Sequence, residues 1–145
     1  MDIEVLRVRV SQEELNSLLE EHVPPDLGIK GLRITLTTEG IQVNGQYTMV
    51  LPISFETLWE PLVVGEQLQG RLTRITVAGF PATKMRGVLL KVLADNIGGQ
   101  PGVHFEGDVI RLDHDAFLRA HKVPVRVKPL AVRCEPGFLV LEGGF

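Results

Sequence analysis

The chain has 145 residues, a mass of 16.0 kDa and a net charge of −3, with 44% apolar and 23% charged side chains and a mean hydropathy of +0.14. This composition excludes a disordered chain, a collagen-like chain and a disulfide-stapled scaffold, and the length suits a single domain over residues 1–145. Cys134 is the only cysteine, which excludes an intramolecular disulfide and a cysteine-built metal site. No apolar run approaches the ~18–20 residues that span a bilayer.

The first residues predict a strand followed by a helix. Residues 3–10 contain charges throughout and alternate valine with arginine, which indicates a strand and not a secretory signal peptide. A cytoplasmic location is therefore expected if Met1 is the native start, and the compartment is unknown otherwise. Ser11 and Glu14 form a capping box, in which the hydroxyl satisfies one free backbone amide and the carboxylate another. The apolar stripe of this N-terminal helix consists of Leu15, Leu18 and Leu19.

A hairpin is the clearest pattern in the sequence. Apolar and polar residues alternate over residues 32–37, Glu39-Gly40 is expected to turn the chain, and the alternation resumes over residues 41–56 as one long second arm. Gly45 interrupts the apolar face without changing the period, which is typical of a bend or of a close approach to the backbone.

A further strand and the main helix are expected next. Residues 62–78 predict a long strand, and the change of parity at Thr73-Arg74 predicts a bulge. Phe80-Pro81 opens the main helix, whose apolar residues recur at helical spacing until Gly98-Gly99 ends it. Short strands follow from residue 103, with a helical turn near Asp115 and a type II turn at Glu135-Pro136-Gly137.

The order of these elements predicts the fold class. Strands that are joined mostly by hairpins form an antiparallel sheet, so the class is α+β. Strands of ten or more residues that bend at bulges and glycines are expected to curl, and a curled sheet needs an apolar filling. We therefore expect a long, strongly bent antiparallel sheet wrapped around one long helix, plus an N-terminal helix.

Enzyme chemistry finds little support in the sequence. No nucleophile elbow, phosphate-binding loop or dinucleotide fingerprint occurs, so we expect a protein that is not an enzyme and uses no cofactor or metal. A hydrolase or metal site would have to use Asp113-His114-Asp115, but neighbouring residues on a strand point to opposite faces, and a cap at a strand–helix junction is the preferred interpretation. Cys134 lies in an alternating apolar pattern, which predicts a small buried side chain and not a catalytic thiol.

Charge is distributed unevenly along the chain. Residues 1–66 contain 4 basic and 11 acidic side chains, whereas residues 67–145 contain 11 basic and 7 acidic ones. The basic runs of the second half indicate either two solvated faces or a cationic surface for an anionic partner, such as a phospholipid headgroup in peripheral contact with a membrane. Nucleic acid is not expected, because the aromatic residues are not interleaved with the basic ones. The candidate headgroup residues are Arg71, Arg74, Lys84 and Arg86.

The long strands and the main helix carry a large amount of apolar surface on one side. This surface is either an ordinary core or the lining of an apolar groove, left open where a curled sheet fails to close on its helix. In the second case the ligand is a lipid or another apolar molecule. The candidate ligand-binding residues are Tyr47, Met49, Phe55, Leu72, Phe80, Met85, Leu89 and Val92.

The element order resembles that of tubular lipid-binding (TULIP-type) modules. These include small bacterial proteins related to mannosyltransferase-assisting lipid-envelope factors and, more distantly, the bactericidal/permeability-increasing protein. The resemblance rests on residues 11–16 with the leucine stripe, the hairpin motif of residues 39–45, the helix from Phe80 and the final strand in residues 136–141. It implies a bent sheet around a long helix, lipid in the groove between them, and no catalytic residues.

Two functions follow from these observations. The first is non-catalytic binding of a lipid or other apolar ligand in a groove between the curved sheet and the main helix. The alternative is an interaction or scaffold domain without a small-molecule ligand, whose exposed sheet edge or apolar face is covered by a partner protein or by a second copy in a homodimer.

Overall fold

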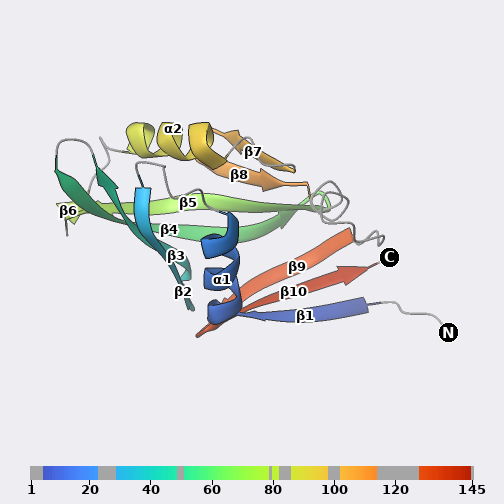
Figure 1. The fold of residues 1–145 in the computed structure, drawn as a ribbon. Helices are drawn as coiled ribbons and strands as arrows, with labels where there is room; N and C mark the ends of the chain where they lie inside the picture. Colours follow the sequence, from blue (N-terminus) through green and yellow to red (C-terminus); the bar gives the residue numbers. More distant parts are fainter. Residues whose placement is uncertain are drawn as a thin grey trace.

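The computed structural model describes residues 5–22, 29–48, 51–78, 80–81, 86–97, 102–113 and 128–144, which are mostly β-strands (Figure 1). In chain order the elements are β1 (Val5–Ser11), α1 (Gln12–His22), β2 (Ile29–Thr37), β3 (Gly40–Thr48), β4 (Pro52–Val64), β5 (Gln67–Val77), β6 (Phe80–Pro81), α2 (Arg86–Ile97), β7 (Val103–Glu106), β8 (Val109–Leu112), β9 (Lys128–Glu135) and β10 (Phe138–Gly144).

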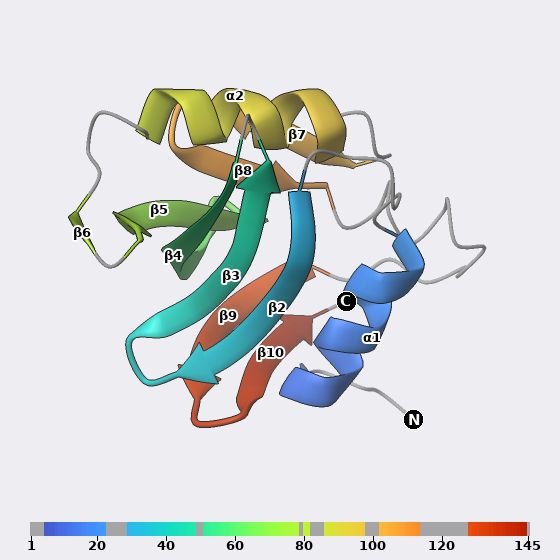
Figure 2. The same ribbon diagram turned by 60° about the vertical axis from the view of Figure 1, so that its left-hand side comes forward.

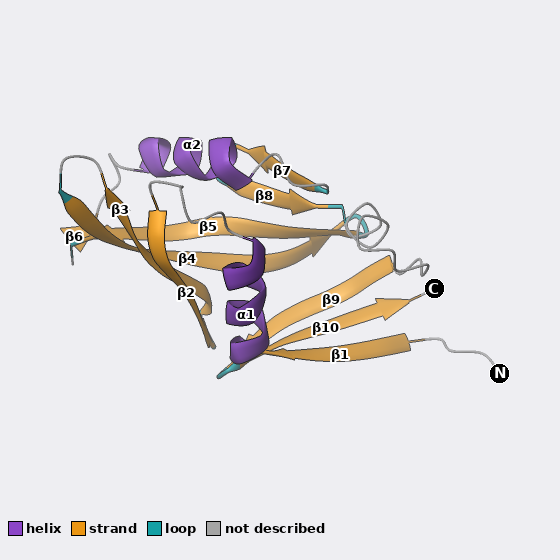
Figure 3. Ribbon diagram, in the orientation of Figure 1, coloured by secondary structure: helices purple, strands orange, loops and turns teal. Residues whose placement is uncertain are grey.

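These strands form two antiparallel sheets. The small sheet has the order β1-β10-β9, and the large sheet has the order β2-β3-β4-β5-β8-β7, with β6 paired to the end of β5. β1 pairs with β10 along all of its 7 residues, so the first and last described strands lie side by side. Figure 3 shows the small sheet beneath the large one, and β9 makes contacts with β4 that join the two sheets.

The prediction of a long, bent sheet wrapped around one long helix is wrong. Both helices in the described part of the chain are short, with 11 residues in α1 and 12 in α2, and strands make up most of that part, so the α+β label fits poorly. Phe80 and Pro81 do not open the main helix but form β6, and the described helix begins at Arg86. Because the terminal strands pair with each other, they form a sheet of their own, and the large sheet does not close around a helix.

The prediction of one long second hairpin arm over residues 41–56 is also wrong. The chain reverses within it, and β3 and β4 run antiparallel with Tyr47 opposite Ile53. The stretch predicted over residues 62–78 is divided in the same way, by a turn at Gly65-Glu66 between β4 and β5. In the β3–β4 register odd-numbered residues face odd-numbered partners, so the alternation continues through the reversal and conceals it.

Three local predictions are confirmed. The amide of Glu14 donates a hydrogen bond to the Ser11 hydroxyl at 3.1 Å, which confirms the Ser11 half of the capping box. The register of β4 and β5 shifts at Thr73, where a bulge was expected. A Cβ on Gly45 would lie 2.8 Å from Cζ of Phe55, so the glycine permits the phenyl ring to approach the β3 backbone closely.

Helix α1 covers the β2 edge of the large sheet. The Asn16 side chain donates from Nδ2 to the carbonyl oxygen of Ile34 at 2.9 Å, and the Ile34 amide donates to Asn16 Oδ1 at 2.7 Å. The Leu36 amide donates to Oε1 of Gln12 at 2.9 Å. These two side chains take the place of a neighbouring strand, and they close this edge to pairing with another chain.

We expect Asn16→Ala to lower the free energy of unfolding by about 1–3 kcal/mol, because it leaves both partly buried main-chain groups of Ile34 without a partner. Denaturant unfolding measures the effect. Ser17→Ala, on the exposed side of the same helix, is the matched control and is expected to change stability by less than about 0.5 kcal/mol. Equal stability of the two variants would contradict the role of Asn16.

A hydrophobic core cluster lies on one face of the large sheet. Odd-numbered residues of β3 and β4 share this face, and α2 lies across the sheet at one end (Figure 2). Apolar residues from β2 at one edge and from β7 at the other pack against the same cluster, which therefore extends across the sheet. The buried core cluster consists of Ile29, Phe55, Trp59, Leu72 and Ile75.

Candidate binding surfaces

Three of the candidate ligand-binding residues lie together on the core face of the large sheet. Phe55 and Leu72 are buried in the core cluster, and Tyr47 packs against this cluster while remaining partly exposed. Met49 and Met85 lie outside the described residues. The side chains of Phe80, Leu89 and Val92 lie outside the described part as well, although their backbones belong to β6 and α2.

Eight partly buried apolar side chains pack against the core cluster, and we refer to them together as the apolar rim. Its eight members come from six elements, namely β2, β3, β5, α2, β7 and β8. Phe105 and Ile110 are absent from the sequence-based candidates, because only the pairing of β8 with β5 brings them to this face. The apolar rim consists of Leu32, Ile41, Val43, Tyr47, Val77, Leu90, Phe105 and Ile110.

The candidate headgroup residues on β5 do not lie on the same face as the apolar rim. Arg71 directly precedes the buried Leu72 on β5, so its side chain points to the opposite face of the sheet. It forms an ion pair with Glu60, with an N–O distance of 2.6 Å. Arg74 forms a longer pair of 3.8 Å with Glu39. Both pairs are solvent-exposed, so they offset charge but contribute little to stability.

Arg86 has a different environment at the start of α2. Its guanidinium donates to the carbonyl oxygen of Leu72 at 2.8 Å and to Oδ2 of Asp108 at 2.7 Å. The Leu72 amide in turn donates to the Asp108 carbonyl oxygen at 2.8 Å. Arg86 therefore attaches α2 to β5 and to the β7–β8 turn. The fourth headgroup candidate, Lys84, lies outside the described residues.

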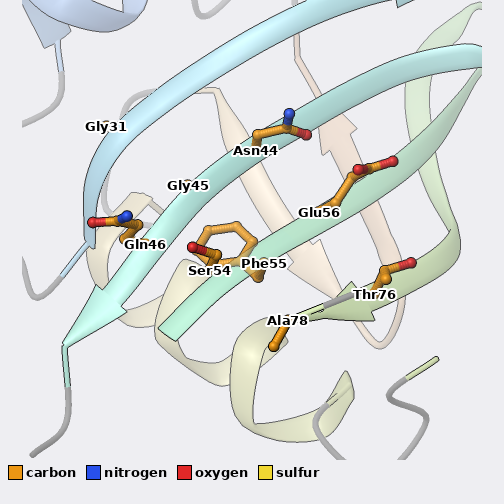
Figure 4. A pocket seen from close by; sticks show the side chains of 9 residues that line it. All are labelled: Gly31, Asn44, Gly45, Gln46, Ser54, Phe55, Glu56, Thr76 and Ala78. Atoms are coloured by element: carbon orange, nitrogen blue, oxygen red, sulfur yellow. The ribbon is translucent and has the colours of Figure 1, made fainter. Parts of the chain in front are cut away.

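A polar depression of about 600 Å³ lies on the face of the large sheet opposite the core (Figure 4). The cross-strand pairs Asn44–Glu56, Gln46–Ser54 and Glu56–Thr76 place these side chains on one face of β3, β4 and β5. The site is open and contains one carboxylate, so it can hydrogen-bond a polar molecule but does not provide an acid–base pair. The lining residues are Gly31, Asn44, Gly45, Gln46, Ser54, Phe55, Glu56, Thr76 and Ala78.

Cys134 and the possible metal ligands are the remaining reactive groups among the described residues. Burial raises the pKa of the half-buried Cys134 thiol, so the unreactive protonated form is favoured at neutral pH. Within the described ranges no three His, Cys, Asp or Glu side chains are arranged to hold a metal. His114 and Asp115, which the sequence singled out, lie outside these ranges.

The comparisons with family models and with curated sequences give no match. The resemblance to tubular lipid-binding modules therefore remains a prediction. In the described part of the chain, neither helix has the length and apolar character needed to cross a membrane.

Proposed function

We propose that the protein is a non-catalytic module that binds a lipid or another apolar ligand on the core face of the large sheet, beside α2. The observation that supports this proposal is the apolar rim, in which eight apolar side chains around a five-residue core remain partly exposed. Covering this surface with an acyl chain removes apolar area from water, at about 25 cal/mol per Å². A rim contributed by six elements also offers a broad surface with which a flexible chain can make contact.

An anionic headgroup is proposed to lie near Arg86. Arg86 lies on α2, one helical turn before Leu90 of the apolar rim, whereas the candidates on β5 point to the opposite face of the sheet. Its side chain is partly exposed, and it already binds the Asp108 carboxylate. A carboxylate or phosphate headgroup would interact with the outer side of the same guanidinium.

A matched pair of variants tests the site. Val77 and Thr76 are neighbours on β5 and lie on opposite faces of the sheet, with Val77 in the apolar rim and Thr76 in the polar depression. We expect Val77→Asp to weaken binding of a fluorescent long-chain fatty acid at least ~10-fold, because the carboxylate would be placed against the acyl chain. Thr76→Asp is expected to bind as the unmodified protein does, and thermal unfolding would check that both variants are folded.

Native mass spectrometry provides the complementary experiment. We expect the purified protein to carry a bound lipid or fatty acid that organic extraction removes. Equal fatty-acid binding by the two folded variants would reject the core face as the site. A ligand-free mass together with an absence of saturable fatty-acid binding would reject the proposed function.

A further inference from the structure

The outer edge of β1 differs from the other sheet edges in the described structure. The β2 edge is covered by Asn16 and Gln12, and β7 has only 4 residues. β9 contains Pro129 and contacts the large sheet through β4. β1 has 7 residues without proline or glycine, and no described strand pairs with its outer side (Figure 1). Long exposed edges of this kind pair readily with a further strand.

Three apolar side chains of β1 are exposed to solvent. The exposed fractions are 57% for Val5, 40% for Leu6 and 41% for Val8. Leu6, Val8 and Val10 alternate along the strand and therefore share one face. This face is continuous with β10, because Val8 is opposite Leu141. A strand added along β1 would cover part of this apolar row while pairing the free main-chain groups.

The sequence of β1 is compatible with pairing to itself. In a two-fold antiparallel arrangement centred on Val8, Leu6 lies opposite the partner's Val10 and Val5 opposite the partner's Ser11, so the whole strand is paired. Apolar residues then meet apolar residues on one face. A shift of one residue would place an arginine opposite a valine on each face, which disfavours the neighbouring registers.

The charged face of β1 is also compatible with this arrangement. Arg7 would lie opposite the partner's Arg9, and like charges in this position normally repel. Each arginine already has a carboxylate on its own sheet, since Arg7 is 2.8 Å from Glu142 and Arg9 is 3.4 Å from Glu135. Arg9 also lies over the ring of Phe138, at 4.3 Å. These contacts offset part of the repulsion and hold the guanidinium groups beside the strand, while Arg133 pairs with the same two carboxylates.

We propose that a second copy of this chain docks along β1, in antiparallel two-fold pairing centred on Val8, so that two small sheets join into one six-stranded sheet. An interface of one strand pair is smaller than the roughly 1,200–2,000 Å² of a typical stable complex, so a dissociation constant of roughly 1–100 µM is expected. This proposal is independent of lipid binding, because the apolar rim lies on the other sheet.

Sedimentation of the full chain from about 1 µM to about 300 µM tests the proposal, since this range brackets the expected dissociation constant. We expect a concentration-dependent dimer, and Val8→Lys should make the chain monomeric because two ammonium groups would meet at the two-fold axis. Leu130→Lys is the matched control, because Leu130 is an exposed apolar residue on β9, at the other edge of the same sheet. This control should still dimerise.

A cross-linking experiment does not depend on the stability of the lysine variants. In a Cys134→Ala background, Val8→Cys is expected to form a covalent dimer on mild oxidation, because directly opposed residues of paired strands bring their Cβ atoms to about 4.5–5.5 Å. Leu130→Cys in the same background should remain monomeric. A wild-type chain that stays monomeric over the whole range, or a dimer that Val8→Lys leaves intact, would overturn the proposal.

Discussion

Gly40→Ala is expected to lower the free energy of unfolding by about 2–5 kcal/mol, from backbone strain and steric overlap together. Gly40 begins β3 directly after the turn residues Thr38 and Glu39, and its φ of 144° is one that L side chains rarely adopt. A Cβ at this position would lie less than 3.0 Å from the main-chain carbonyl oxygen of Trp59. Neither group can move away without disturbing the pairing of β3 and β4, which organises the core face.

Chemical denaturation of Gly40→Ala and of Gly65→Ala separates the two causes. Gly65 also has a positive φ, of 56°, but no heavy atom lies within 4 Å of a Cβ built there. Its substitution is therefore expected to lower the free energy of unfolding by about 1–2 kcal/mol, only because an alanine is strained in the left-handed backbone conformation. If the two variants are equally destabilised, the close approach of Trp59 to Gly40 is not the cause.

Trp59→Ala is expected to lower the free energy of unfolding by about 3–5 kcal/mol, because it leaves a cavity in the core cluster. Part of this loss comes from two linked hydrogen bonds that connect β4 to β3. Trp59 Nε1 donates to Oγ1 of Thr57 at 2.8 Å, and this buried hydroxyl donates to the carbonyl oxygen of Val43 at 3.1 Å. The indole therefore packs the core of the large sheet and orients the side chain that links β4 to β3.

Trp59→Phe is the control, since it retains an aromatic ring in the core while it removes the N–H donor and part of the indole. Its expected cost is about 1–2 kcal/mol, from the lost buried hydrogen bond and the smaller ring. Circular dichroism should follow the unfolding, because Trp59 is the only tryptophan and its fluorescence is lost in both variants. A cost below about 1 kcal/mol for Trp59→Ala would be inconsistent with a core of this kind.

The two proposed surfaces lie on different sheets, so their tests do not interfere. Val77 belongs to the large sheet and Val8 to the small one. Val77→Asp is expected to leave the monomer–dimer equilibrium unchanged, and Val8→Lys is expected to leave fatty-acid binding unchanged. A loss of both properties in either variant would indicate a general failure to fold.

Several local structural features can be predicted from the sequence alone. The Ser11 cap, the β2–β3 hairpin, the bulge at Thr73 and the close approach at Gly45 each depend on a few neighbouring residues. Each follows from turn chemistry, from periodicity or from the absence of a side chain, all of which act over short distances along the chain.

The candidate site was predicted in part for the same reason. Phe55 and Leu72 were placed on the apolar side of their strands, and alternation is enough to assign such a side. Alternation could not reveal that the chain reverses within residues 41–56. Odd-numbered residues of β3 pair with odd-numbered residues of β4, so the same alternation continues on both sides of the reversal. The exception to the pattern at Pro52, the first residue of β4, is the local sign of the reversal.

Only the tertiary structure decided how distant segments combine. It paired β1 with β10 and so divided the strands between two sheets, and it brought Phe105 to the core face through β8. It also provided Arg71 and Arg86 with the carboxylates of Glu60 and Asp108. The physical reason is that pairing between remote strands depends on the burial and hydrogen bonding of the whole chain, and local periodicity does not contain that information.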